Sequence, residues 1–364
     1  MWLPRLVHNE PAKVRLGLPP NTRELSQFET QCHGSDIHTP RSMMLLLFHT
    51  ADIFIWGFDY KLGGTRRDLN ELKATGLLCN EVSELAKLGY QHQYGIEVDE
   101  SLLSLAAAPF EALWKQCRNP QAFVFHHSYA ESASLPCANQ SDAGFMPHAQ
   151  YFPAVLLREF DLDHIPYLGS FASGCTGLLS LIMTASGLCA FSSRDPVICL
   201  TADIKPAGTT YDALREKILT TDCSSGFVIG REECGYQLLG ISYYSTKRLH
   251  MPLVEIVKLT VQMVRNLTKA LGVDGDSSDL IVHYPNIFPD VWDMVSKYLK
   301  IPRASHVMEG FADRAHCLSS DSIISLATRH CGQSGRLHVV VNFGSGLHLG
   351  VGIFREKERR EPAV

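Results

Sequence analysis

Gly169-Ser-Phe-Ala-Ser-Gly-Cys-Thr-Gly-Leu-Leu-Ser-Leu-Ile182 passes from the end of an apolar, strand-like run into a helical pattern within a few residues. Cys175 therefore stands at a strand-to-helix turn, at or next to a helix N-terminus. Unpaired N–H groups and the helix dipole at such a place favour a thiolate. Gly174 and Gly177 leave room for a substrate to approach the sulfur, as a nucleophile requires. Most cysteines are instead buried structural residues, so this pattern alone leaves both interpretations open.

The length and composition of the chain restrict its class. A chain of 364 residues exceeds what one hydrophobic core usually holds, so two core-sized halves are expected. The 45% hydrophobic and 20% charged fractions are typical of a soluble globular protein. A net charge of −5 argues against a nucleic-acid partner. The apolar run Met43 to Phe48 is far too short to cross a bilayer, so we expect no membrane partner.

The cysteines and the N-terminus predict a compartment. Eleven cysteines occur without a Cys-x-x-Cys pair, and no Cys/His group has the spacing of a zinc site. We therefore expect no metal, reduced thiols and a cytoplasmic location. The N-terminus lacks the basic and apolar segments of a signal peptide.

Apolar runs of strand length alternate with helical patterns along most of the chain. This alternation predicts an α/β class. The polar, proline-dotted residues 1–42 are expected to form an N-terminal arm. We expect an N-terminal half with the nucleophile over 43–225 and a C-terminal half over 226–364. Buried strands are predicted at 122–126, 196–203, 280–284 and 337–342, and helices at 253–271 and 321–330.

Three further features can carry chemistry. His283 ends an apolar strand, and strand ends are where sites form in open α/β sheets. His316 precedes a helix that Ser319 or Ser320 can cap. Phe343-Gly-Ser-Gly346 joins two apolar strands, and its backbone N–H groups can hold an oxyanion. Each feature also has an ordinary interpretation, as a histidine without a catalytic role or as a simple glycine turn.

Taken together, these pieces resemble the β-ketoacyl-acyl-carrier-protein synthase III group of the thiolase superfamily. The resemblance covers roughly residues 50 to 356. It implies the five-layered αβαβα thiolase fold, built from two duplicated halves, and a dimer through the N-terminal half. The matching stretches, in the order of that family, are Gly174-Cys-Thr-Gly177, Thr201-Ala-Asp203, Thr221-Asp-Cys-Ser-Ser-Gly226, His283-Tyr-Pro-Asn286 and Phe343-Gly-Ser-Gly346.

The same resemblance implies the chemistry. Cys175 takes an acyl group from acyl-CoA or an acyl-carrier protein and becomes a thioester. His283 assists proton transfer, and the backbone N–H groups of Cys175 and Ser345 form the oxyanion hole. No cofactor is implied beyond the CoA or carrier protein of the substrate. The partners are therefore that thioester and a second synthase subunit, identical or related.

The chain also departs from the family. The third catalytic residue of the family is an asparagine in a Gly-Asn pair, and the matching pair here is Ala315-His316. Elongating ketoacyl synthases use Cys-His-His, so His316 can still be catalytic. Asp313 or Asp321 can orient a histidine in a variant that transfers acyl groups without decarboxylation. Phe288 stands where the family has an arginine for the carrier protein.

Three functions follow. The first is an acyl-transferring condensing enzyme in specialised polyketide or fatty-acid-type biosynthesis. The second is an acyltransferase that passes its acyl group to an oxygen, nitrogen or carbon nucleophile without decarboxylation. The third is a catalytically silent subunit of a heteromeric synthase.

Overall fold

In the computed structural model, all the described residues belong to one compact unit, which spans Ser42 to Val364. The N-terminal arm expected over residues 1–42 lies outside the described residues. The structure describes residues 43–48, 52–117, 119–136, 149–162, 164–191, 195–248, 250–273, 280–330, 332–344 and 348–357.

The first part of the chain builds a series of five strands, in the order β8-β5-β9-β10-β2. β5 pairs in parallel with both β8 and β9, whereas β10 pairs antiparallel with both β9 and β2. β5 and β9 are fully buried, as their continuous apolar runs predict, whereas β8 at the edge is largely exposed. The strands are β2 (Phe54–Leu62), β5 (Ala122–His126), β8 (Tyr167–Ser170), β9 (Val197–Asp203) and β10 (Cys223–Gly230).

The second part of the chain repeats this topology in the order β13-β12-β14-β15-β11. β12 is parallel to β13 and β14, and β15 is antiparallel to β14 and β11. β11 also pairs with β2 and with β1 (Met43–Leu47), which makes one mixed sheet. The division predicted after residue 225 falls inside β10. The strands are β11 (Tyr236–Ser245), β12 (Leu280–His283), β13 (His306–Val307), β14 (Leu337–Gly344) and β15 (His348–Glu356).

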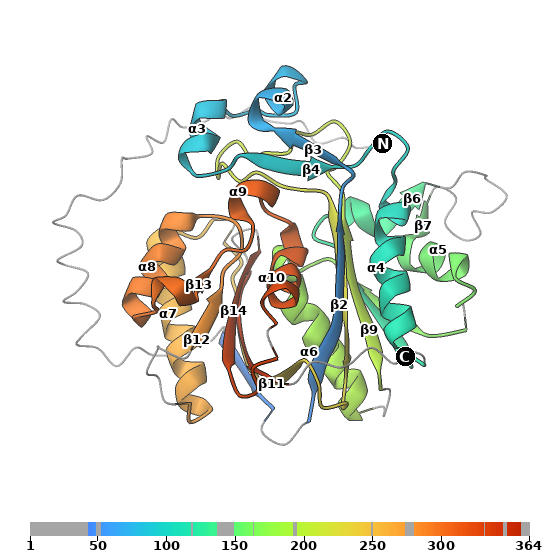
Figure 1. Ribbon diagram of the computed structural model, residues 1–364, viewed down its shortest axis with the longest axis vertical. Helices are drawn as coiled ribbons and strands as arrows, with labels where there is room; N and C mark the ends of the chain where they lie inside the picture. Colours follow the sequence, from blue (N-terminus) through green and yellow to red (C-terminus); the bar gives the residue numbers. More distant parts are fainter. Residues whose placement is uncertain are drawn as a thin grey trace, which may run out of the picture. The chain divides into compact units, whose positions relative to one another are not determined.

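Two helices fill the space between the two strand series. α6 (Gly177–Phe191) and α10 (Asp321–Arg329) pack Ile182 and Ile323 between Val124 of β5 and Val340 of β14. α6 has no charged residue, as expected for a helix covered on both sides. Figure 1 shows both helices between the blue-to-green strands and the orange-to-red strands.

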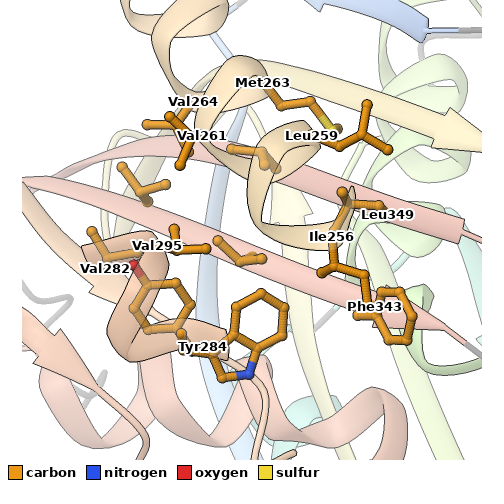
Figure 2. Close-up of a cluster of buried hydrophobic side chains, with 14 of the residues drawn as sticks. Ile256, Leu259, Val261, Met263, Val264, Val282, Tyr284, Val295, Phe343 and Leu349 are labelled. Carbon is orange, nitrogen blue, oxygen red and sulfur yellow. The ribbon is translucent and has the colours of Figure 1, made fainter. Parts of the chain in front are cut away.

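Amphipathic helices cover the outer faces. α4 (Leu102–Gln116) and α5 (Phe152–Glu159) pack against β5 and β9. α7 (Leu253–Ala270) and α8 (Pro289–Leu299) pack against β12, β14 and β15. Figure 2 shows side chains of α7, such as Ile256 and Leu259, gathered with Val282 and Leu349. Helix, strand, helix, strand and helix layers follow one another, which confirms the predicted five-layered αβαβα fold.

A smaller cluster lies beside the loop that carries His316. β3 (Thr65–Asp68) and β4 (His92–Gly95) form a two-stranded sheet next to α2 (Leu69–Ala74) and α3 (Val82–Lys87). Buried Leu72, Leu85 and Tyr90 pack there together with Ala315. The ring of Tyr90 lies 4.5 Å from that of Phe311, at the start of α9 (Phe311–Arg314). This packing holds the chain segment that leads into His316.

Candidate active site

Cys175 lies in a single 3₁₀ turn, Gly174–Thr176, between β8 and α6. Its thiol is free and partly exposed. Gly174 has φ +50°, a conformation that favours glycine. The carbonyl of Gly174 accepts from His126 Nε2 at 2.8 Å and from Ser319 Oγ at 3.1 Å. The turn is therefore tied to β5 on one side and to the segment after His316 on the other.

Two glycines allow close packing around this turn. A Cβ on Gly177 would lie 2.4 Å from both His126 Cδ2 and Ser319 Oγ. A Cβ on Gly344 would lie 3.2 Å from the backbone nitrogen of Cys175. The end of β14 therefore reaches the turn of the cysteine, as an oxyanion hole there requires. Ser345 itself lies outside the described residues, so its role stays a prediction.

His316 reaches Cys175 from the loop between α9 and α10. The side chain of His316 interacts electrostatically with that of Cys175, and Nδ1 of the ring lies 2.5 Å from Asp321 Oδ2. Since Nδ1 faces the carboxylate, Nε2 is the nitrogen that remains for the sulfur. Cys175, His316 and Asp321 thus lie in the order in which a catalytic triad places its nucleophile, base and carboxylate.

The backbone at His316 is held on both sides. The N–H of His316 donates to Leu219 O at 2.9 Å, and its carbonyl accepts from Thr221 N at 3.0 Å. Ala315 is fully buried with φ +51° and ψ −149°, a conformation that is strained for any residue except glycine. Asn286 Nδ2 donates to Ala315 O at 2.8 Å. These contacts hold the strained backbone at Ala315 in place and so fix the position of His316.

Asp321 accepts four hydrogen bonds at the N-terminus of α10. His316 and the backbone N–H of Asn286 (2.8 Å) bind Oδ2. Arg314 Nη1 (2.6 Å) and the backbone N–H of Cys317 (2.9 Å) bind Oδ1. Only 2% of the Asp321 side chain is exposed. A buried carboxylate with this many donors stays charged.

The charges in this site shift two pKa values. For Asp321, burial favours the neutral acid, but His316 and Arg314 outweigh burial and lower the pKa to about 2. For His316, burial favours the neutral ring, but the charges of Asp321 and Cys175 outweigh it and raise the pKa to about 10. The resting site therefore holds an imidazolium on His316 beside the carboxylate of Asp321.

His283 does not join this group. It is fully buried at the end of β12, with Nδ1 at 2.7 Å from Ser325 Oγ and Nε2 at 2.9 Å from His338 Nδ1. Burial, and then the charge of His338, lower its pKa well below the usual range. Both ring nitrogens are engaged inside the C-terminal half, so the proton-transfer role that the resemblance implies for His283 has a better candidate in His316.

Only one of the two aspartates predicted as possible orienting groups contacts His316. Asp321 orients His316, whereas Asp313 lies 2.5 Å from Arg66 Nη2 and 3.2 Å from Tyr94 OH at the surface. Sequence reasoning missed Arg314 and the backbone N–H of Asn286 as partners of Asp321. The only signal for Arg314 was its place two residues before His316.

The raised pKa of His316 predicts how stability depends on pH. In Cys175→Ala, Asp321 still favours the imidazolium, so the folded protein keeps a proton that the unfolded chain loses near pH 6.5. This stabilisation is complete below that pH and is lost as pH rises toward the pKa of the folded state. The free energy of unfolding should fall by up to about 1.4 kcal/mol per pH unit. Urea unfolding of Cys175→Ala, beside Cys175→Ala/His316→Gln, measures this. Equal pH slopes in the two variants would contradict it.

Comparisons with known proteins give a likeness in structure alone. No family model matches the sequence, and no curated protein is similar to it in sequence. The 3-oxoacyl-[acyl-carrier-protein] synthase III from Aquifex aeolicus superposes with a TM-score of 0.66 at 14% identity, over 83% of this chain and 99% of that chain. The chain has the synthase III fold. Within the described residues, no helix is both long and apolar enough to span a bilayer.

Other structures with the synthase III fold are also similar. The acyltransferase ChlB3 has a TM-score of 0.67 at 15% identity, over 85% of this chain and 99% of that chain. A type III pentaketide synthase from Neurospora crassa has a TM-score of 0.65 at 13% identity, over 84% of this chain and 100% of that chain. These proteins differ in reaction, so the fold alone leaves the reaction of this chain to be argued from its site.

Proposed function

We propose that this protein is an acyltransferase that carries its acyl group on Cys175. The observation that supports the proposal is the series Cys175, His316 and Asp321 at the N-terminus of α6. The Cys175 sulfur attacks the carbonyl carbon of an acyl-CoA or acyl-carrier-protein thioester. The bond to the departing thiol breaks, and that thiol takes a proton from His316. The product is a thioester on Cys175 and a neutral imidazole.

The second half-reaction returns the proton. An O–H or N–H nucleophile attacks the thioester carbonyl, His316 accepts its proton, and the Cys175 sulfur leaves as a thiolate. Asp321 holds the imidazole in the tautomer that this step needs. We therefore propose transfer to an oxygen or nitrogen acceptor without decarboxylation. An imidazole with a carboxylate partner is suited to deprotonating such an acceptor, and ChlB3, with the same fold, is an acyltransferase.

Decarboxylative condensation is the second candidate, and the synthase III fold favours it. With this second candidate we propose a cytoplasmic enzyme of fatty-acid or polyketide biosynthesis. The two candidate functions differ in whether CO2 is released. Malonyl-CoA offered to the acylated enzyme should release no CO2, whereas amines and alcohols should become acylated. Release of CO2 that depends on Cys175 would favour condensation.

We also propose that the protein is a dimer through β8. This strand ends the order of the sheet and exposes Leu168 (47%), followed by Phe171 (55%). An apolar sheet edge that leads to Cys175 is suited to pairing with a second copy. Leu168→Glu is expected to raise the dissociation constant of the dimer about a hundredfold or more, since it places a charge in the interface.

Sedimentation velocity over a range of concentrations measures this effect. Val98→Glu is the matched control, because Val98 is a fully exposed apolar residue away from the sheet edge. A wild-type monomer, or an equal effect of both variants, would contradict the proposed interface.

A further inference from the structure

We propose that Arg314 is a positioning residue that sets how many protons the Cys175–His316 pair holds at each stage of the reaction. This inference rests on the proposed function. Arg314 touches no reacting atom and acts through Asp321. Its Nη1 lies 2.6 Å from Asp321 Oδ1, and both side chains are buried.

The position of Arg314 is built into the loop. Gly310 has φ +61°, and a Cβ there would lie 3.1 Å from both Cγ and Nε of Arg314. Thr221 Oγ1 donates to the carbonyl of Arg314 at 2.7 Å. The aliphatic part of the Arg314 side chain thus packs against the backbone of Gly310, where no side chain intervenes. The guanidinium contacts the Asp321 carboxylate in the protein interior.

Counting charges shows what Arg314 does in the free enzyme. The arginine, Asp321, His316 and a Cys175 thiolate alternate as plus, minus, plus and minus, so the charges of the four groups sum to zero, with only Cys175 partly exposed. Without Arg314 the same state has a net charge of −1. A net charge is unfavourable in a buried site, so the neutral state would then be a protonated thiol beside the imidazolium. Arg314 is therefore what makes the reactive thiolate the balanced state.

The same count applies to the acyl-enzyme. A thioester on Cys175 carries no charge, so Arg314 offsets part of the attraction of Asp321 and His316 releases its proton more readily than in the free enzyme. Without Arg314, Asp321 would retain the proton on His316, and no base would remain for the acceptor. Removing this one charge therefore impairs both half-reactions, in each case by retaining a proton.

Other titratable groups face the site from neighbouring elements. Burial is the largest cause that lowers the pKa of His126 to about 4 and raises those of Tyr129, Tyr90 and Cys223, so these groups are neutral near pH 7. Burial also raises the pKa of Asp203 to about 7, and the backbone N–H groups of Ser128 and Tyr129 bind its carboxyl. Cys317 contacts both Cys223 and Arg314, so the test needs a variant without the Cys317 thiol as a control.

The test is the pH profile of Cys175 alkylation by iodoacetamide. The alkylated peptide is quantified by mass spectrometry from about pH 5 to about pH 10, without substrate. In Arg314→Gln the midpoint of the profile should rise by roughly one to three pH units, which slows alkylation at neutral pH at least about tenfold. Arg314→Lys keeps the charge and should keep the wild-type midpoint. Acetylation by p-nitrophenyl acetate and the pH profile of its loss test the acyl-enzyme, whose deacylation midpoint should also rise.

Two controls assign the result. Arg303→Gln removes an exposed arginine that pairs with Asp293 at 2.8 Å and should not move the profile. Cys317→Ala should also leave it unchanged, because the reacting thiol is Cys175. An Arg314→Gln profile with a lower amplitude and an unmoved midpoint would overturn the proposal, since that is what a purely structural salt bridge would give.

The remaining outcomes are also decisive. If Arg314→Gln does not fold, Arg314→Lys decides alone, because a displaced midpoint with the charge retained would overturn the role of charge, and a wild-type midpoint would support it. Failure of the proposed function has a different signature. Wild-type Cys175 would then react no faster than a free thiol at neutral pH, whatever stands at position 314.

Discussion

Cys175→Ala should abolish acyl transfer while the fold remains intact. The sulfur is the only group on the proposed path that bonds to the acyl carbon, so its loss should lower turnover by roughly 10⁴-fold or more. The side chain is partly exposed and small, which makes the effect on the free energy of unfolding minor. Single-turnover transfer from an acyl-CoA, read beside urea unfolding, measures both.

Cys79→Ala is the matched control, because Cys79 is an exposed free thiol far along the chain from the turn of the nucleophile. It should retain wild-type turnover. Turnover in Cys175→Ala close to that of the wild type would move the chemistry to another residue. A loss of activity that merely follows a loss of folding would leave Cys175 as a structural residue.

Asp321→Asn should lower turnover on the order of 10³- to 10⁴-fold, because the amide no longer favours the imidazolium or the correct tautomer of His316. It should also destabilise the fold by about 3–5 kcal/mol, since Arg314 loses its buried anionic partner. Acylation and deacylation rates at a temperature well below the melting transition, together with urea unfolding, separate the two effects.

Asp313→Asn provides a matched comparison. Asp313 lies on the same loop and pairs with Arg66 at the surface, so its replacement should change turnover less than about twofold and stability by less than about 1 kcal/mol. Equal losses of turnover in the two variants would contradict the assignment of Asp321 as the orienting carboxylate.

The pattern of the sequence predicted the α/β class and the place of Cys175 at a helix start, and the resemblance to a known family implied the five layers. Continuous apolar runs predicted β5, β9, β12 and β14, and the glycine-rich turn before α6 predicted Cys175 at a helix start. These features depend on local chemistry that one stretch of sequence contains. The structure agrees with these layers, because the central helix α6 has no charged residue whereas the outer helix α7 is amphipathic.

The choice between His283 and His316 could not be made in this way. Which side of a strand a residue faces depends on register, and a shift of one position reverses it. His283 faces Ser325 and His338, although the sequence around it matches the motif of the family. His316 depends on the backbone at Ala315 and on contacts with Leu219 and Thr221, which are remote in sequence. The contribution of Arg314 likewise depends on burial, which the sequence does not state.

The most direct test of the account is the intact mass of the protein after incubation with a panel of acyl-CoA and acyl-carrier-protein thioesters. We expect a single acyl increment that maps to the Cys175 peptide, is blocked by prior alkylation and is absent in Cys175→Ala. An increment that persists in Cys175→Ala, or no increment with any donor, would contradict the account, and the second result would favour a catalytically silent subunit.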